Sequence, residues 1–457
     1  MKKFLLIVLL VPLLLVTLWG LDQKFDLRKS AFGKKADIVV DLAQPGGRIS
    51  ASLWRNFAQG GEEPVDMIAP VLGLTKDLQP EVIRIDHIFD FYVTINGDQY
   101  DFSKLDGVVR TILSTGAVPM LALSYMPSAL AEDGQVISPP KDWSAWQRLV
   151  AATVARYSGK NGLNLYNIYY EVWNEPDLFG GWHYGKTPNY LTLYRYSVLG
   201  AKSVTNVNPF KLGGPATTGF YPNWLKALFK FADANKLPVD FVSWHRYTSD
   251  LDEYQQDFEK LNRILTDYPD YQNVERMITE FGPDSENSPW YDNQIGAAHT
   301  IAGMIKLLGK VHRVFTFEIK DGPDPAGKQY WGRWGLVTHE KQGVVTKPRY
   351  RAIQFLNQLS GNRLSLDGEG SWVSAVASQD QKTTKVLLVN YDSRNSNYES
   401  VPVTLNNASP GLYLFKLSYL DGKSSSSREN LVGQTQIKKE IILPPNSAAL
   451  AEWRKMN

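Results

Sequence analysis

The sequence predicts an α/β protein of two parts, a (β/α)8 TIM barrel followed by a C-terminal all-β sandwich domain. From about residue 54 to 360, short apolar runs alternate with longer amphipathic runs, the rhythm of repeated βα units around a parallel sheet. After that stretch the pattern changes to short alternating strands with turn residues between them. A chain of 457 residues accommodates one barrel and a small partner domain.

Eight short apolar runs are the predicted barrel strands, because each is apolar enough to be buried on both faces. They are Ser52–Ala58, Val82–Asp86, Ala117–Leu123, Tyr166–Val172, Lys211–Gly214, Val239–Trp244, Glu275–Glu280 and Arg313–Ile319. The runs between them carry apolar residues at three- and four-residue spacing, which predicts helices. Examples are Trp143–Tyr157, Asn189–Thr205, Pro222–Asn235 and Asn293–Leu308, with a final helix at Lys347–Ser360. Eight alternations in order favour a closed barrel over an open sheet.

The C-terminal region predicts a small β-sandwich. Its expected strands are Val386–Val389, Val401–Leu405, Leu412–Leu420, Gln436–Ile442 and Ala448–Trp453, with breaks at Asn395–Asn397 and Ser424–Ser427. A further strand is expected at Asp37–Leu42, and the sequence leaves open whether it pairs with the sandwich. We therefore divide the chain into an N-terminal anchor and linker (1–35), this extra strand (36–50), the barrel (51–360) and the sandwich (361–457).

Composition excludes several functional classes. The chain has 49 basic and 47 acidic residues and no long basic run, so it lacks the charge pattern that binds a nucleic-acid backbone. It has no cysteine, which excludes disulfides, thiolate nucleophiles and cysteine-ligated metals. With 43% apolar and 21% charged residues, most of the chain is expected to fold in water.

The N-terminus has the layout of a secretory or anchoring segment. Lys2 and Lys3 precede an apolar stretch, Phe4–Leu21, that is about as long as a membrane-spanning helix. No small-x-small cleavage site follows it, so we expect an uncleaved membrane anchor with the enzyme facing the periplasm or the exterior. Secretion of a cleaved form is the alternative.

Two glutamates follow predicted barrel strands at the end where barrel enzymes place their active sites. Glu175 lies in Val-Trp-Asn-Glu-Pro after the fourth strand, and Glu280 lies in Ile-Thr-Glu-Phe-Gly at the end of the seventh. Cleaving a glycosidic bond takes one carboxyl group that protonates the leaving oxygen and one carboxylate that attacks or stabilises the anomeric carbon. The pair needs neither metal nor cofactor, and none is predicted.

Several motifs strengthen this interpretation. They are Tyr125-Met126-Pro127, Glu171-Val172-Trp173-Asn174-Glu175-Pro176, Leu212-Gly213-Gly214-Pro215-Ala216, Asp240-Phe241-Val242-Ser243-Trp244-His245-Arg246-Tyr247 and Thr279-Glu280-Phe281. Together they resemble glycoside hydrolase family 39, the family of β-xylosidases and α-L-iduronidase, over most of residues 50–360. The resemblance implies a retaining mechanism, with Glu175 as acid/base and Glu280 as nucleophile. It also implies that Asn174 binds the sugar 2-hydroxyl and that His245 and Tyr247 line the site, with Tyr247 donating to Glu280.

Other polar residues near the glutamates have different expected roles. Glu171 lies inside its strand, so we expect it to be structural and paired with Arg84 inside the barrel. The xylosidases of the family carry a sugar-binding histidine two residues after the strand-two arginine, whereas here Asp86 stands there and His87 comes third. We carry that role to neither residue. Asp177 and Gly282 also depart from the xylosidase pattern, so the scaffold matches better than the sugar pocket.

Aromatic residues in the predicted strand-end loops are candidates for stacking on sugar rings. They are Trp182, Trp290, Tyr291, Trp331 and Trp334, of which we single out Trp290, Trp331 and Trp334 as substrate-binding. The alternative for each is that it caps the barrel core.

The sequence therefore predicts a retaining glycosidase acting on an extracellular or periplasmic oligo- or polysaccharide, either β-xyloside-like or an exopolysaccharide. Two alternatives remain open: a carbohydrate-binding barrel with weak catalysis, and a transglycosylase.

Overall fold

The computed structural model describes residues 33–97 and 99–456. They divide into two compact units, Arg48–Ser360 and a second unit made of the residues up to Gly47 together with those from Gly361 onward. The segment Phe4–Leu21, expected to be an anchor, lies outside the described residues. Within the described part, no helix has the length and apolarity that crossing a membrane requires.

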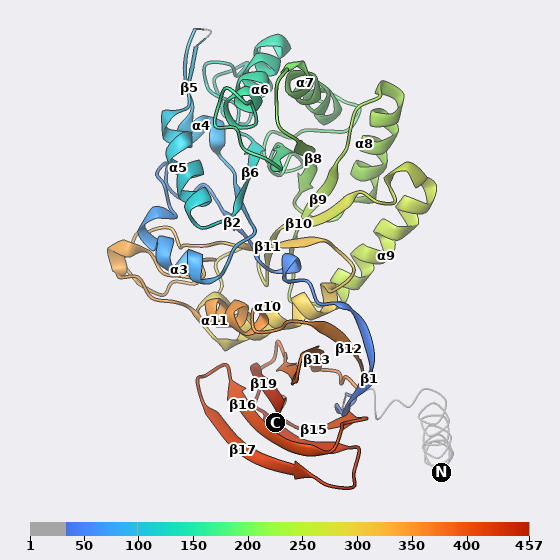
Figure 1. Ribbon diagram of the computed structural model, residues 1–457. Coiled ribbons are helices and arrows are strands. Elements are labelled where there is room, and N and C mark those ends of the chain that lie inside the picture. Colours follow the sequence, from blue (N-terminus) through green and yellow to red (C-terminus); the bar gives the residue numbers. More distant parts are fainter. Residues whose placement is uncertain (1–32, 98, 457) are drawn as a thin grey trace, which may run out of the picture. The chain divides into compact units, whose positions relative to one another are not determined.

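The larger unit is a closed barrel of eight parallel strands, surrounded by helices (Figure 1). In barrel order its strands are β10 (Glu275–Gly282), β11 (Arg313–Phe317), β2 (Asn56–Gln59), β3 (Val82–Ile85), β6 (Val118–Leu123), β7 (Ile168–Val172), β8 (Phe210–Thr217) and β9 (Phe241–Tyr247). Read from β2 this is chain order, and β11 pairs with β2 to close the ring, as the TIM-barrel prediction requires. The predicted fold class is confirmed.

Helices surround the barrel, and polar side chains cap some of them. The main ones are α3 (Leu72–Asp77), α4 (Ile88–Tyr92), α5 (Ser103–Ser114), α6 (Trp143–Tyr157), α7 (Tyr190–Ser203), α8 (Pro222–Asn235), α9 (Asp252–Asp267), α10 (Gln294–Leu307) and α11 (Pro348–Leu356). Asp142 caps α6 and Asn189 caps α7, each accepting a hydrogen bond from a backbone N–H in the first turn. On α6, Trp146, Leu149 and Val150 are buried at helical spacing.

The first predicted strand is shorter than expected. Residues Ala51–Leu53 form a 3-10 helix, capped by the side chain of Ser50, and the strand begins only at Asn56. A 3-10 turn of three residues has no periodicity of its own in the sequence, so its Leu53 looked like part of the apolar strand run. A small hairpin, β4 (Thr94–Asn96) and β5 (Gln99–Asp101), was also not expected.

Inside the barrel, a polar layer follows an apolar one. Val82 and Tyr169 belong to a buried apolar cluster. Two residues further along the same strands are Arg84 and Glu171, neither of which has any exposed surface. Because alternate residues of a strand point to the same side, Arg84 and Glu171 also point into the barrel. The polar layer lies nearer the C-terminal ends of the strands, where an active site is expected.

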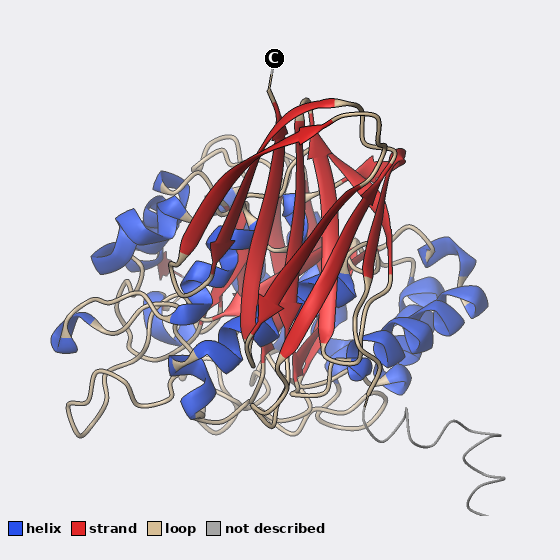
Figure 2. Cartoon of the chain, turned by 90° about the horizontal axis from the view of Figure 1, so that it is seen from below, coloured by secondary structure: helices blue, strands red, loops and turns tan. Residues whose placement is uncertain are grey.

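The second unit is one nine-stranded sheet of mostly antiparallel strands. In sheet order these are β17 (Ser424–Leu431), β16 (Gly411–Tyr419), β19 (Ser447–Lys455), β14 (Thr383–Asn390), β13 (Val373–Asp380), β12 (Asn362–Asp367), β1 (Ile38–Arg48), β15 (Glu399–Asn406) and β18 (Ile437–Leu443). Figure 2, with strands in red, shows the long strands of this sheet lying side by side. The extra strand expected near Asp37–Leu42 is part of β1, which pairs in parallel with β15.

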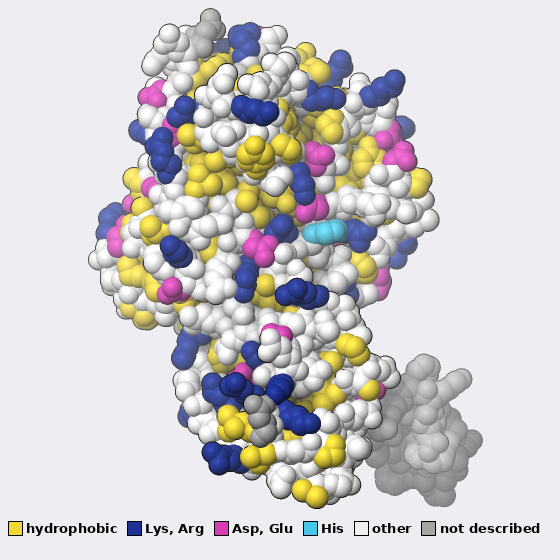
Figure 3. All heavy atoms as spheres, in the orientation of Figure 1, with side chains coloured by type: hydrophobic (Ala, Val, Ile, Leu, Met, Phe, Trp, Pro, Cys, Tyr) yellow, Lys and Arg dark blue, Asp and Glu magenta, His cyan; other side chains and the backbone are white. Residues whose placement is uncertain are grey.

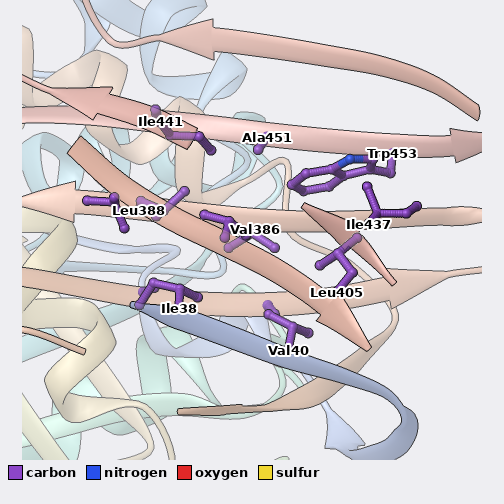
Figure 4. Close-up of a cluster of buried hydrophobic side chains, with 14 of the residues drawn as sticks. Ile38, Val40, Val386, Leu388, Leu405, Ile437, Ile441, Ala451 and Trp453 are labelled. Atoms are coloured by element: carbon purple, nitrogen blue, oxygen red, sulfur yellow. The ribbon is translucent and has the colours of Figure 1, made fainter. Parts of the chain in front are cut away.

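The sheet curls around a single core. β17 and β18 are the two edge strands of the sheet. Nζ of Lys439 on β18 nevertheless lies 2.5 Å from Oε1 of Glu429 on β17, so the two edges come together. The enclosed side chains come from both ends of the sheet and include Ile38, Ile441 and Trp453 (Figure 4). Its two halves therefore pack face to face as in a sandwich.

The serine run Ser424–Ser427 is not the predicted break but the first half of β17. Its backbone pairs with β16, with Ser418 opposite Ser424. All four serines are exposed, so the run has no apolar alternation from which a strand could be recognised. β17 is an edge strand, so backbone hydrogen bonds hold it along one side. Its polar side chains disfavour pairing of the free edge with another molecule.

Surface charge is mixed over the barrel unit. On the face shown in Figure 3, basic and acidic side chains are interspersed over this unit instead of forming one basic field. This agrees with the net charge of +2.

Candidate active site

Glu175 is held by a strained turn after β7. Its φ is 47° and that of Trp173 is 71°, values that residues other than glycine rarely adopt. The backbone N–H of Glu175 donates to the carbonyl of Ala216, near the end of β8, over 2.9 Å. Strain of this kind persists where the surroundings fix the chain, and it is concentrated at functional sites. Here it places the Glu175 side chain in the pocket at the barrel mouth.

Glu280, on β10, is more deeply buried. Its Oε1 accepts a hydrogen bond of 3.0 Å from Nη1 of Arg84, and its Oε2 accepts one of 2.7 Å from the hydroxyl of Tyr247. The prediction that Tyr247 donates to Glu280 is confirmed. Both carboxylate oxygens therefore have a donor, and the side chain is fixed in orientation.

His245, on β9, joins the two glutamates. Its Nδ1 lies 2.8 Å from Oε1 of Glu175 and 3.5 Å from Oε2 of Glu280. The imidazole has no exposed surface, so it lies behind the carboxylates and does not line the pocket itself. Strands four, six and seven thus bring together the three residues that the sequence placed at their ends.

Arg84 links the structural and the chemical parts of the site. Its Nε donates to Oε2 of Glu171 over 2.6 Å, which confirms the predicted pair. Its Nη2 donates to Oδ1 of Asn174 over 2.6 Å, and Nη1 reaches Glu280. The amide nitrogen of Asn174 donates in turn to the hydroxyl of Tyr125 over 2.7 Å. One buried guanidinium therefore positions Glu280 and Asn174, two of the residues expected to touch the sugar.

The electrostatics of the site are set by burial. Burial raises the pKa of Glu280 to about 7, although the positive charges of His245 and Arg84 lower it. For His245, burial acts to lower the pKa, but the charge of Glu280 and the hydrogen bond to Glu175 outweigh it, so that the pKa is raised. The raised pKa of His245 favours the protonated imidazole, whose Nδ1 then donates to Oε1 of Glu175.

The site opens into a pocket of about 840 Å³. Its lining comprises Gly60, Gly61, Glu62, Asp86, His87, Tyr125, Asn174, Glu175, Asp177, Leu178, Phe179, Thr218, Tyr247, Glu280, Ser285, Glu286, Asn287, Phe317, Arg333 and Trp334. Of the three tryptophans expected to bind substrate, Trp334 is in this lining, whereas Trp290 and Trp331 are not. A pocket of this size is within the range of small-ligand sites.

The other two aromatic candidates belong to the core. Trp182 is 1% exposed and packs edge-on against Trp173, with 5.3 Å between ring centres. Tyr291 has no exposed surface, and its hydroxyl donates to the carbonyl of Asp284. For these residues the alternative reading, capping of the barrel core, is the one that the structure favours.

Several lining residues were not singled out from the sequence. Asp177 accepts a hydrogen bond of 3.0 Å from the backbone N–H of Thr218. Glu62 pairs with Arg333, whose guanidinium carbon lies 3.5 Å from the ring centre of Trp334. Asp177 was noted in the sequence only as a departure from the xylosidase pattern, although its position two residues after Glu175 places it at the barrel mouth. The Glu62–Arg333 pair joins two loops that are far apart in the sequence, so no local sequence pattern predicts it.

The same side chains are the candidate metal ligands in the described part of the chain. Ligand atoms of Glu175, His245 and Glu280 lie within 4.8 Å of one another. These atoms already hydrogen-bond among themselves and with Tyr247 and Arg84. The donor set therefore fits acid–base chemistry without requiring a metal.

An eight-stranded barrel with two carboxyl groups meeting at the C-terminal ends of its strands has the architecture of barrel glycosidases. The sequence profile of glycosyl hydrolases family 39 matches residues 76–434, and the chain belongs to this family.

Two curated relatives are β-xylosidases. The one from Geobacillus stearothermophilus is 29% identical over 311 residues, and the one from Caldicellulosiruptor saccharolyticus is 27% identical over 326 residues. These alignments cover 61% and 64% of this chain, and 60% and 64% of the relatives. The chain thus matches less than two thirds of the length of either relative.

Solved structures resemble the whole fold. A family 39 enzyme from Xanthomonas axonopodis pv. citri has a TM-score of 0.74 at 19% identity, covering 93% of this chain and 98% of that one. A monomeric β-xylosidase from Caulobacter crescentus has a TM-score of 0.73 at 18% identity, covering 92% and 100%. A bacterial orthologue of human α-L-iduronidase has a TM-score of 0.68 at 13% identity, covering 93% and 84%. At these identities the likeness concerns the fold.

Proposed function

We propose that the protein is a retaining glycosidase that cleaves O-glycosidic bonds by double displacement through a glycosyl-enzyme on Glu280. The observation that carries the proposal is the closeness of the two carboxyl groups. An oxygen of Glu175 and an oxygen of Glu280 lie within 4.8 Å of each other. Retaining enzymes hold the groups about 5–5.5 Å apart, whereas inverting enzymes need about 6.5–9.5 Å to admit a water molecule.

In the first step, Glu175 donates its proton to the glycosidic oxygen while a carboxylate oxygen of Glu280 attacks the anomeric carbon. The bond to the leaving group breaks with its electron pair on the protonated oxygen. Glu175 becomes a carboxylate at this moment, and the hydrogen bond from protonated His245 stabilises the new charge. Arg84 and Tyr247 keep the ionised Glu280 aimed at the carbon before attack.

In the second step, Glu175 acts as the base. It takes a proton from water, whose oxygen attacks the anomeric carbon and displaces Glu280 as a carboxylate. Two inversions give net retention, and both glutamates return to their starting protonation states. A sugar hydroxyl in place of water would give transglycosylation by the same route.

The substrate class we propose is an oligo- or polysaccharide with β-xyloside-like linkages. Support comes from the two relatives named β-xylosidase. An exopolysaccharide remains the second candidate, because a pocket volume of about 840 Å³ has room for more than one sugar ring. Of the three tryptophans singled out from the sequence, Trp334 is the one that lines the pocket and can stack on such a ring.

The proposed location is outside the cytoplasm, and it rests on the sequence alone. Lys2, Lys3 and Phe4–Leu21 have the layout of an export signal. Fractionation of cells that express the full chain, combined with N-terminal sequencing, separates an anchored, a secreted and a cytoplasmic protein.

The test of the mechanism is proton NMR of the first product formed from an aryl β-xyloside or from the best substrate of an aryl-glycoside panel. Release of the sugar with the configuration of the substrate is expected, and release of the opposite anomer would contradict retention. Binding of sugars without turnover would instead favour the binding-barrel alternative. Oligosaccharides that accumulate at high acceptor concentration would favour the transglycosylase.

A further inference from the structure

Two apolar side chains are exposed next to the proposed acid. Leu178 and Phe179 are 60% and 38% exposed, and both line the pocket. Their backbone N–H groups donate to the carbonyl of Glu175 over 3.0 and 2.7 Å, so they lie one turn of chain beyond it. The ring of Phe179 packs edge-on against Tyr125, with 5.7 Å between ring centres, which fixes its orientation. Neighbouring apolar side chains that stay exposed in a pocket wall indicate a binding surface.

This wall of the pocket faces the leaving group. Under the proposed function, Glu175 protonates the leaving oxygen, whereas the transferred sugar is attached to Glu280. Glu175 follows β7, and the loop after the adjacent strand β8 contributes Thr218 to the pocket. Glu280 lies on β10, which β8 and β9 separate from β7. The loops after β7 and β8 therefore border the part of the substrate that departs.

A line of hydrogen bonds runs along the same wall. The hydroxyl of Thr218 donates to Asp177, and both residues line the pocket. A threonine hydroxyl has one proton to donate, so Thr218 accepts in its second contact, 3.1 Å from the hydroxyl of Tyr221. Tyr221 is 45% exposed. The oxygens of Asp177 and Tyr221 keep lone pairs that can accept, and the hydroxyl groups of a sugar are suitable donors.

A second exposed tyrosine lies at the start of α8. Tyr221 immediately precedes this helix, and the ring of Trp224 in its first turn packs edge-on against Tyr184, with 5.4 Å between ring centres. Tyr184 is 40% exposed. Aromatic rings beside a few hydrogen-bonding groups suit a ligand that has both apolar faces and polar edges, as a sugar ring has. The surface suited to sugar rings thus extends beyond the pocket lining.

We propose that Phe179, Asp177 and Tyr221 bind the leaving group, and that this leaving group is a sugar chain of at least two rings. Phe179 meets the apolar face of the first ring, and Asp177 accepts hydrogen bonds from its hydroxyls. Tyr221 lies outside the pocket lining and meets the second ring. This inference rests on the proposed function and specifies its substrate as a saccharide chain instead of the glycoside of a small alcohol.

The test examines the leaving-group side alone. The activated 2-deoxy-2-fluoro derivative of the best sugar in the aryl-glycoside panel traps the glycosyl-enzyme, and added acceptors then release it. An acceptor takes the place that the leaving group has vacated, because the second step reverses the first with a different oxygen. The acceptors are xylose, xylobiose and xylotriose, the matching glucose series, and benzyl alcohol, which is apolar and has no ring hydroxyls. Recovery of activity with time gives the rate of release.

In the wild type, the best disaccharide should release the enzyme at least about tenfold faster than benzyl alcohol, which leaves the acceptors of Asp177 unpaired. Phe179→Ala should reduce the acceleration by the disaccharide about 3–10-fold, because an aromatic contact is lost. Tyr221→Ala should remove the advantage of the disaccharide over the monosaccharide. Tyr166→Ala is the matched control, since Tyr166 is 59% exposed but precedes β7, at the opposite end of the barrel. Its acceleration should equal that of the wild type.

Equal acceleration in the wild type and in Phe179→Ala would overturn the inference, as would release by benzyl alcohol that matches release by the sugars. Thermal unfolding checks that each variant folds. If Phe179→Ala does not, Phe179→Leu replaces it, because leucine keeps an apolar side chain without the flat ring. A wild type that is trapped but released by no sugar acceptor would overturn this inference alone. A wild type that forms no glycosyl-enzyme would overturn the proposed function, and this inference with it.

Discussion

Nη1 of Arg84 lies 3.0 Å from Oε1 of Glu280, and the opposite side of the same guanidinium is neutralised by Glu171. All three side chains are buried. The orientation of the proposed nucleophile thus depends on a carboxylate that is itself too deep to touch substrate.

Replacing Glu171 by Gln should therefore weaken both folding and catalysis. It removes one of the two buried carboxylates that pair with Arg84, and breaking a buried pair costs about 3–5 kcal/mol in the free energy of unfolding. Without Glu171 to fix its Nε, the guanidinium should hold Glu280 and Asn174 less precisely, which lowers kcat. Urea unfolding and steady-state kinetics measure the two effects. The control is Asp267→Asn in the exposed pair with Lys226, which should cost less than about 1 kcal/mol. Equal costs for the two variants would contradict the role assigned to Glu171.

Removing either glutamate should give a distinct product with azide. Glu280→Ala should be nearly inactive on every substrate, because no leaving-group activation replaces a missing nucleophile. Any azide product it forms should be inverted. Glu175→Ala should complete its first step on an activated aryl glycoside, accumulate the intermediate and then yield a retained azide product. NMR of the azide and mass spectrometry of the trapped enzyme are the measurements. A sugar attached to a residue other than Glu280 would contradict the assignment of Glu280 as the nucleophile.

The pH dependence should follow Glu280. Burial raises its pKa to about 7, and a protonated Glu280 cannot attack, so kcat/KM should fall as the pH decreases below about 7. His245→Asn removes a charge that lowers this pKa, and the acidic limb should move to higher pH. His312→Asn is the control, because His312 precedes β11 at the other end of the barrel from the site. An acidic limb that stays in place in His245→Asn would show that another group controls it.

Among the tryptophans, only replacement of Trp334 is expected to affect a small substrate. Trp334→Ala should raise KM by up to about tenfold, since an aromatic contact contributes about 0.5–1.5 kcal/mol beyond its buried area. Trp290→Ala and Trp331→Ala should change KM for an aryl glycoside less, because neither residue lines the pocket. Comparable increases for all three variants would mean that the bound sugar extends beyond the pocket wall.

The sequence predicted the barrel and its central residues because both obey local rules. Buried parallel strands are continuous apolar runs, and the residue that follows each run lies at the barrel mouth. This is sufficient to place Glu175 and Glu280 together. The pairing of Glu171 with Arg84 followed from a second rule, that a charge inside a strand must find a partner.

What the sequence missed depends on contacts between loops. Whether Trp331 or Trp334 faces the pocket is decided by how Arg333 packs between them and against Glu62, across 271 residues of chain. The strand β17 was missed for a different reason, because an edge strand of exposed serines buries nothing. In each case the deciding interaction leaves no periodic trace in the sequence.

The place of β1 in its sheet has a consequence for how the protein is made. β1 is the earliest strand of the described chain, and it lies between β12 and β15, which follow the whole barrel. During synthesis, both of its neighbours emerge from the ribosome only after more than 300 residues of barrel have been completed. The barrel can fold as its strands are synthesised. Until β12 and β15 have been made, however, the backbone N–H and C=O groups of β1 have no strand to pair with. A chain that ends after Ser360 would lack both neighbours of β1. The unpaired backbone edges of β1 would then stay exposed and could pair with another molecule.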